Sequence, residues 1–260
     1  FISEKKFHHS FLIPLMAAFC LSGTLSGSGA KSGAGDAPVT HGVAIGAVEE
    51  GSALFWSRTD REAQMHLAIE SEDGVSVLEK STPVRANRDF TGKIKVSGLK
   101  TDTLLSYRVW FTVENPESPG KFPALRGKFR TAPSGMAAQA VSFAWSGDVA
   151  GQNVCRDADE GFPVFKAINS LPIDFFIGLG DMIYADNTCQ ETGKFGNRQI
   201  PGNFKPSATM EDYWEHWKYN REDPGYRQLL AKTPYFVIWD DHEVVNDFGP
   251  LQDTRDKPPY

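Results

Sequence analysis

Three short acidic motifs, each following an apolar run typical of a β-strand, are the part of this sequence best suited to chemistry. They span Trp145–Asp148, Gly180–Tyr184 and Trp239–Glu243. The carboxyl ends of parallel strands meet at one edge of a sheet, so we expect the motifs to converge there. Convergent carboxylates repel one another unless cations lie between them, and the pattern therefore predicts a dinuclear metal site.

Each motif also has a simpler interpretation when it is taken alone. Asp148 could be a turn residue or a helix N-cap. Tyr184 could be a packed core residue instead of a phenolate ligand of a hard trivalent cation. The third motif is the most specific, because Tyr235–Trp239 leads into four ionisable residues without a turn residue. A solvated acidic loop is the alternative there.

The three motifs together resemble those of the calcineurin-like metallophosphoesterase superfamily. The Asp-Asp-His-Glu form with its Trp is similar to the PhoD branch of alkaline phosphatases and phosphodiesterases. The resemblance implies that Asp148 binds one metal and Asp181 bridges both. It also implies that Asp241 is a metal ligand and His242 the catalytic histidine.

The same resemblance implies the identity of the metals and the reaction. Members similar to purple acid phosphatases bind ferric iron through the Tyr that corresponds to Tyr184, and PhoD-type enzymes combine iron with calcium. Asn246 would be a neutral oxygen ligand or a phosphate donor. A metal-bound hydroxide would attack phosphorus in line, and His242 would orient the phosphoryl oxygens or protonate the leaving group. The substrate would be a small phosphate mono- or diester, with a phospholipid left open.

Two departures from the family pattern are visible. Ala150 stands where relatives carry a histidine, and no histidine follows His242. Because the chain also begins with Phe1, we expect a fragment that holds an amino-terminal domain and the first half of the catalytic domain, in which missing ligands weaken metal binding.

The amino terminus has the pattern of a secretory signal. Lys5 and Lys6 precede the apolar run Phe11–Cys20, which is too short to span a bilayer. We expect residues 1–37 to be a signal peptide and flexible leader, and the protein to be exported to the periplasm, the cell surface or the medium.

The intervening patterns predict two folded regions. Short β-type runs with turn signals between them indicate a β-sandwich over residues 38–133, similar to fibronectin III or immunoglobulin-like domains. Residues 138–260 read as an incomplete α/β metallophosphoesterase domain, with a helix at 162–168 and two helices within 208–231. The uniform apolar runs at 174–179 and 235–239 predict buried strands in a sheet covered on both faces.

Two cysteines occupy matching places beyond the first two motifs. Cys155 lies seven residues after Asp148, and Cys189 lies eight residues after Asp181. Loops that leave neighbouring strands at one sheet edge can bring such residues into disulfide range, so a Cys155–Cys189 bond is preferred. Two free thiols or thiolate ligands are the alternatives.

The net charge and the absence of several motifs exclude some classes of function. A net charge of −6 argues against nucleic acid as a stable partner. The sequence contains no Walker loop, dinucleotide fingerprint or serine nucleophile elbow. Metal-assisted hydrolysis remains, and its rival is an exported binding or adhesion protein that acts through the sandwich and carries a degenerate phosphoesterase domain.

Overall fold

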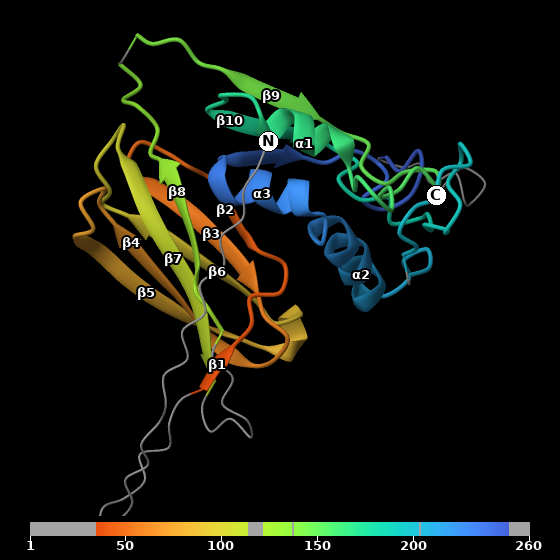
Figure 1. Cartoon of the computed structure of the whole chain (residues 1–260), viewed down its shortest axis with the longest axis horizontal. Coiled ribbons are helices and arrows are strands. Elements are labelled where there is room, and N and C mark those ends of the chain that lie inside the picture. The colour runs from red at the N-terminus through yellow and green to blue at the C-terminus, as the bar shows by residue number, and fades with distance from the viewer. Residues whose placement is uncertain (1–34, 114–121, 137, 203, 250–260) are drawn as a thin grey trace, which may run out of the picture. The chain divides into compact units, whose positions relative to one another are not determined.

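The computed structural model describes residues 35–113, 122–136, 138–202 and 204–249. All of them belong to one compact unit, residues 32–260. Figure 1 shows their arrangement. The elements are β1 Gly35–Ala37, β2 Val43–Gly46, β3 Ser52–Arg58, β4 Ala63–Glu70, β5 Ser76–Val84, the 3-10 helix η1 Ala86–Arg88, β6 Thr91–Ser97, β7 Leu104–Val113, β8 Leu125–Arg130, β9 Phe143–Ser146, α1 Pro163–Asn169, β10 Phe175–Leu179, α2 Met210–Arg221, α3 Pro224–Lys232 and β11 Tyr235–Ile238.

The first sheet is antiparallel and has the order β5-β4-β7, with β1 and β8 both pairing with β7. Strand β7 alternates between half-buried and buried residues along its whole length. This period of two is expected for a strand with one face in a core. Its Tyr107 ring lies edge-on to Phe55 of β3, with 5.3 Å between the ring centroids, so the core lies between this sheet and the second one.

The second sheet has the order β6-β3-β2-β11-β10-β9. Strands β6, β3 and β2 are antiparallel, whereas β11, β10 and β9 run parallel to one another. Strand β2 joins the two halves through a parallel pairing in which Gly46 lies opposite Tyr235. The regions that the sequence separates as sandwich and α/β domain therefore share one continuous sheet.

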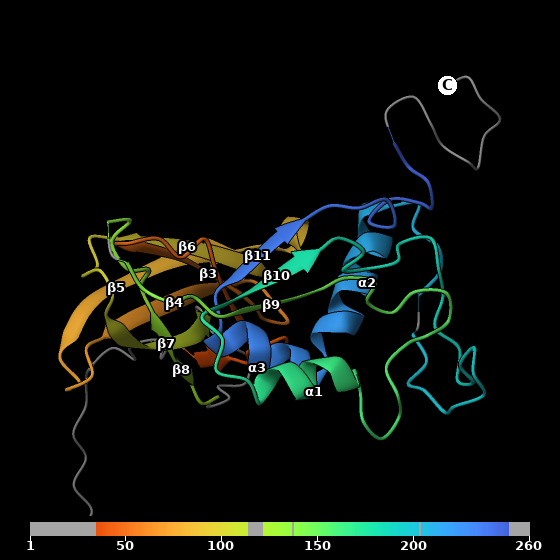
Figure 2. The same cartoon turned by 90° about the horizontal axis from the view of Figure 1, so that it is seen from above.

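Helical crossovers connect the parallel strands. Helix α1 links β9 to β10, and α2 and α3 link β10 to β11. Both helical predictions are confirmed, and the break between α2 and α3 falls at Asp223, whose carboxylate accepts a hydrogen bond from the backbone of Tyr226 at 2.7 Å. Figure 2 shows α1 and α3 together on one side of β9–β11. Phe165 of α1 stacks on Tyr226 of α3, with centroids 4.4 Å apart.

The opposite face of β9–β11 is uncovered among the described residues, so the prediction of a sheet covered on both faces is wrong for them. Trp145 is 61% exposed and Ile238 54% exposed. A uniform apolar run reveals that both faces of a strand are apolar, but it cannot reveal what lies against each face.

Two further differences concern the first sheet. Residues Gly35–Ala37, predicted as leader, form β1 on the edge of β7. The rest of the predicted signal and leader, residues 1–34, lies outside the described residues. Strand β5 was not predicted, because most of its side chains are exposed and Pro83 interrupts the pattern.

Among the helices that the structure describes, none has both the length and the apolar character needed to cross a bilayer.

Candidate functional site

The three acidic motifs lie at the same edge of the second sheet. Strands β9, β10 and β11 are adjacent and parallel, and Asp148, Asp181 and Asp241 follow their carboxyl ends. The strand registers bring these ends level, since Ser146 lies opposite Gly178 and Leu179 lies opposite Ile238. The parallel order therefore delivers three carboxylates to neighbouring loops.

The loops approach one another so closely that two positions require glycine. A Cβ on Gly147 would lie 2.9 Å from the carbonyl oxygen of Gly180, and a Cβ on Gly180 would lie 2.5 Å from the Cβ of Asp240. Asp148 and Asp181 have φ values of 57° and 52°, in the left-handed region that non-glycine residues seldom adopt. Such backbone strain is concentrated at functional sites.

Asp181, Asp241 and His242 form the group best suited to a metal ion. Each offers one ligand atom, and the three atoms lie within 4.8 Å of one another. Asp181 is 6% exposed, and its burial raises the pKa of the carboxyl above the usual value. Carboxylate oxygen and imidazole nitrogen are common metal donors. A bound cation would offset the cost of burying the charged form of the Asp181 carboxyl.

Asp186 holds the imidazole of His242. Its carboxylate lies 2.9 Å from Nδ1 of His242. Burial lowers the pKa of His242, but the hydrogen bond and charge of Asp186, with the charges of Asp181 and Asp241, raise it overall. Contact at Nδ1 fixes the ring and leaves Nε2 for a ligand. Sequence reasoning missed Asp186, although it lies only two residues beyond Tyr184, the last residue of the second motif.

Tyr184 connects Asp148 to this group. Its hydroxyl donates to Oδ1 of Asp148 at 2.7 Å, and its ring stacks on His242 with centroids 4.0 Å apart. Gly151 makes room for the ring, because a Cβ there would lie 2.3 Å from Cζ of Tyr184. Burial, then the hydrogen bond to Asp148 and the charge of Asp181, raise the pKa of Tyr184. The phenol therefore keeps its proton unless a cation is bound.

Glu243, in the third motif but given no role from the sequence, connects two of the loops. Its carboxylate accepts hydrogen bonds from the backbone of Asp181 at 3.1 Å, Met182 at 2.8 Å and Asp240 at 3.0 Å. One buried carboxylate thus fixes the position of Asp181 relative to the end of β11.

Asn246 contacts the site through its backbone. Its N–H donates to Oδ2 of Asp186 at 3.0 Å, and its side-chain amide donates to Asp247 at 2.6 Å. The structure thus brings Asp181, Asp241 and His242 together, with Asp148 and Tyr184 adjoining and Asn246 at the rim.

A disulfide joins the loops that follow β9 and β10. Cys155 and Cys189 are bonded, with their Cα atoms 5.8 Å apart, as the sequence predicted. The bond links the loop of Asp148 to that of Asp181.

The sequence matches one family over both halves of the chain. Residues 143–259 match the PhoD-like phosphatase family, and residues 25–133 match the N-terminal domain of PhoD-like phosphatases. The chain belongs to the PhoD-like phosphatase family.

Two relatives show how much of the family fold is present. The chain is 26% identical over 228 residues to alkaline phosphatase D of Bacillus subtilis (strain 168), an alignment that covers 82% of this chain and 36% of that protein. The solved structure of PhoD superposes with a TM-score of 0.68 at 21% identity, over 88% of this chain and 44% of that one. The chain therefore spans less than half the length of either relative.

Proposed function

We propose that this chain acts in an exported, metal-dependent hydrolase of phosphate esters, of the alkaline phosphatase or phosphodiesterase type. The observation that carries the proposal is the group Asp181, Asp241 and His242, held at the carboxyl ends of adjacent parallel strands. Membership of the PhoD-like phosphatase family supports the phosphate-ester class. Small phosphate mono- and diesters are the proposed substrates.

The donor set is proposed to hold two metal ions. Asp181 would bridge them, Asp148 and Tyr184 would hold the first, and Asp241 the second. A phenol and carboxylates suit a trivalent ion such as iron, and carboxylate and amide oxygens suit calcium. When bound, the ions would lower the pKa of a water nucleophile and neutralise charge on the phosphoryl group.

The residues of this chain would orient the ester and move a proton. Asp186 holds His242 at Nδ1, so the ring can present Nε2 to a phosphoryl oxygen or to the leaving oxygen. Asn246, at the rim, is proposed to assist as a phosphate donor or neutral ligand.

We also propose a domain organisation and a location for the protein. Residues 38–133 would be a fibronectin III-like or immunoglobulin-like sandwich and residues 138–260 the first part of a metallophosphoesterase domain. The residues before β1, 1–34, would direct export. The disulfide suits an oxidising compartment, which supports an exported location.

Asp181→Asn in the full-length protein tests the proposal. Removing the bridging charge should lower the content of both metals together, measured by elemental analysis of protein purified without chelators. Hydrolysis of p-nitrophenyl phosphate and bis-p-nitrophenyl phosphate should be lost as well. Asp159→Asn, which changes an exposed carboxylate paired with Arg198, is the matched control and should keep both. Full metal content in Asp181→Asn would refute the bridging role.

A further inference from the structure

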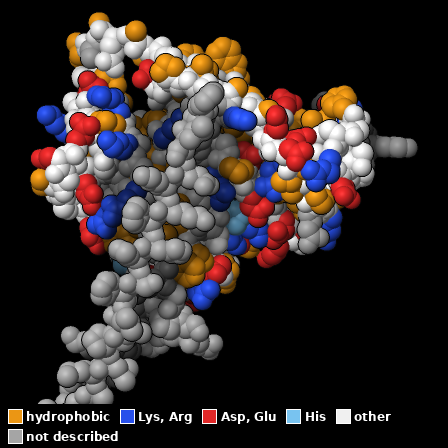
Figure 3. Space-filling model, in the orientation of Figure 1, with side chains coloured by type: hydrophobic (Ala, Val, Ile, Leu, Met, Phe, Trp, Pro, Cys, Tyr) orange, Lys and Arg blue, Asp and Glu red, His pale blue; other side chains and the backbone are white. Residues whose placement is uncertain are grey.

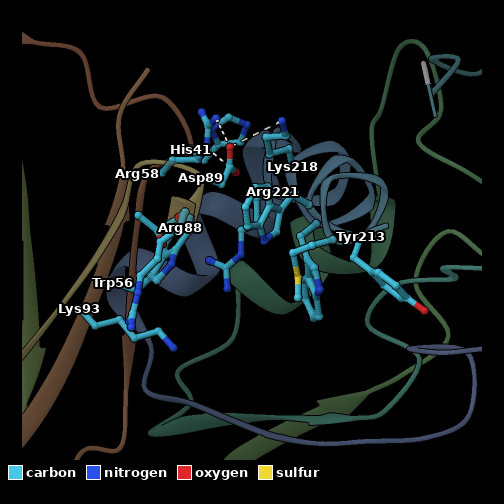
Figure 4. A pocket seen from close by; sticks show the side chains of 13 residues that line it. His41, Trp56, Arg58, Arg88, Asp89, Lys93, Tyr213, Lys218 and Arg221 are labelled. Carbon is cyan, nitrogen blue, oxygen red and sulfur yellow. Dashed lines mark hydrogen bonds and ion pairs between the residues drawn. The ribbon is translucent and has the colours of Figure 1, made fainter. Parts of the chain in front are cut away.

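A cavity of about 400 Å³ lies between the first half of the chain and helix α2, and none of the candidate metal ligands lines it. One wall comes from β3, η1 and β6 and carries Trp56, Arg88 and Lys93. The other comes from α2 and carries Tyr213 and Lys218. Figure 4 shows these two walls. Volumes of this size are typical of small-molecule sites.

The lining is strongly basic although the chain has a net charge of −6. Asp89 is the acidic residue among the lining residues, and the Lys and Arg residues are Arg58, Arg88, Lys93, Lys218 and Arg221. A concave site with one sign of charge focuses the electrostatic potential and concentrates ligands of opposite charge.

Two of these cations are already neutralised. Arg58 donates to both carboxylate oxygens of Asp89, at 2.8 and 2.7 Å. Lys218 pairs with Glu215 and lies 3.9 Å from Asp89. The nearby carboxylates therefore neutralise Arg58 and Lys218.

Three cations remain for a ligand. Within the described ranges, Arg88, Lys93 and Arg221 have no carboxylate partner. Arg221 stacks on the ring of Trp56 with its Cζ 4.2 Å from the ring centroid, and its buried Nη1 has no hydrogen-bond partner among the described residues. A buried, unpartnered guanidinium nitrogen is costly unless an acceptor arrives.

Aromatic side chains line the cavity beside these cations. Trp56, Tyr213, Trp214 and Trp217 line the cavity, and each is partly exposed. Three of the six tryptophans in the chain are thus gathered beside the free cations. Flat rings beside arginine and lysine suit a ligand that has both a planar ring and an anionic group.

We propose that this pocket binds a small organic phosphate that carries an aromatic ring, with Arg88, Lys93 and Arg221 receiving the phosphate and the tryptophans receiving the ring. The site is distinct from the candidate metal group. Helix α2 lies between the two sites, because Asn220 on its other face donates to the carbonyl oxygen of Met182 at 2.8 Å.

Tryptophan fluorescence of the chain, titrated with adenosine 5′-monophosphate in the presence of EDTA, tests the proposal. EDTA removes metal ions, so phosphate cannot be held by them. Lys93→Gln and Arg88→Gln should each weaken binding about tenfold, the loss expected for one charge-assisted hydrogen bond. Both residues are exposed, so the variants should fold.

Lys95→Gln is the matched control, because Lys95 lies two residues further along β6, is also exposed and does not line the cavity. It should leave the affinity unchanged. Adenosine and inorganic phosphate should each bind at least about tenfold more weakly than the nucleotide. Equal affinity for adenosine, equal affinity for inorganic phosphate, or equal losses in Lys93→Gln and Lys95→Gln would overturn the proposal.

Discussion

At the scale of single residues, the properties of His242 depend on a neighbour outside the three motif cores. Asp186 contacts both Nδ1 of His242 and the backbone of Asn246, so one carboxylate positions two residues of the third motif. A carboxylate that holds one ring nitrogen of a histidine also fixes the orientation of the other ring nitrogen.

We therefore expect Asp186→Asn to lower kcat/KM for hydrolysis of p-nitrophenyl phosphate about tenfold or more in the full-length protein. The Asn side chain can still accept a hydrogen bond, but it lacks the charge that favours the correct ring orientation. Steady-state kinetics measure the change. Asp159→Asn should show no loss, and an unaltered kcat/KM in Asp186→Asn would refute a positioning role.

His41 provides a pH-dependent contribution to stability. Burial, followed by the charges of Arg58 and Lys218, lowers its pKa from 6.5 to about 4. At neutral pH the ring is uncharged, so its 3.8 Å approach to Glu222 is not an ion pair. Between pH 6.5 and 4 the unfolded state binds the extra proton and the folded state does not, so stability falls as the pH falls.

His41→Gln should remove this dependence. The wild-type chain should lose about 3 kcal/mol more than the variant between pH 7 and 4, measured by urea unfolding at each pH. His66→Gln is the comparison, because the half-buried His66 has its pKa lowered mainly by desolvation and should show a smaller change. Parallel pH curves for wild type and His41→Gln would contradict the assignment.

At the scale of elements, the loops after β9 and β10 lack regular structure for most of their length and are tied by the Cys155–Cys189 bond. The two cysteines are 34 residues apart in the sequence. Closing a loop of this length restricts the unfolded chain and stabilises the fold by about 4 kcal/mol in the chain-entropy model.

The double variant Cys155→Ala/Cys189→Ala should therefore unfold at lower urea concentration, with a loss of about 3 to 4 kcal/mol. A reducing agent should produce a similar loss in the wild-type chain and leave the double variant unchanged. If the reducing agent leaves the midpoint of urea unfolding of the wild-type chain unchanged, the bond contributes nothing to stability.

The sequence predicted the elements with a clear apolar pattern and missed those without one. Strand β7 and helices α1 and α3 have buried residues at the spacing of their own element. Strand β5 is mostly exposed, and β1 is three residues long, so neither has a pattern to detect. The pairing of β2 with β11 joins residues far apart in the chain, and no local pattern specifies it.

The site residues also fall into those that the sequence predicted and those that it missed. Asp181, Asp241 and His242 follow strands, so their convergence could be predicted from strand order alone. The contacts of Asp186 and Glu243 depend on how three loops fold against one another, which sequence spacing does not encode. The basic pocket combines β3, β6 and α2 and could not be found in any single segment.

At the scale of the whole described unit, the uncovered face of β9–β11 is the largest departure from ordinary burial. Its outward side chains are in register across three strands, with Trp145, Ile177 and Phe236 in one row. Figure 3 shows hydrophobic side chains gathered over β9. A groove of about 430 Å³ at one end of this face is lined by Phe175, Ile177 and Phe236, among others. Contiguous apolar surface of this kind favours association.

We expect the 260-residue chain to bind the dye 8-anilinonaphthalene-1-sulfonate and to self-associate as its concentration rises, because water contact with this face is unfavourable. Trp145→Thr/Ile238→Thr should reduce both effects, measured by dye fluorescence and analytical ultracentrifugation. Val75→Thr/Val77→Thr is the matched control, since it removes two exposed apolar side chains at the start of β5, in the other sheet. If the two double variants reduce dye binding and self-association equally, these effects come from individual exposed apolar residues and the prediction is wrong. If only the first reduces binding and association, the contiguous face of β9–β11 is responsible.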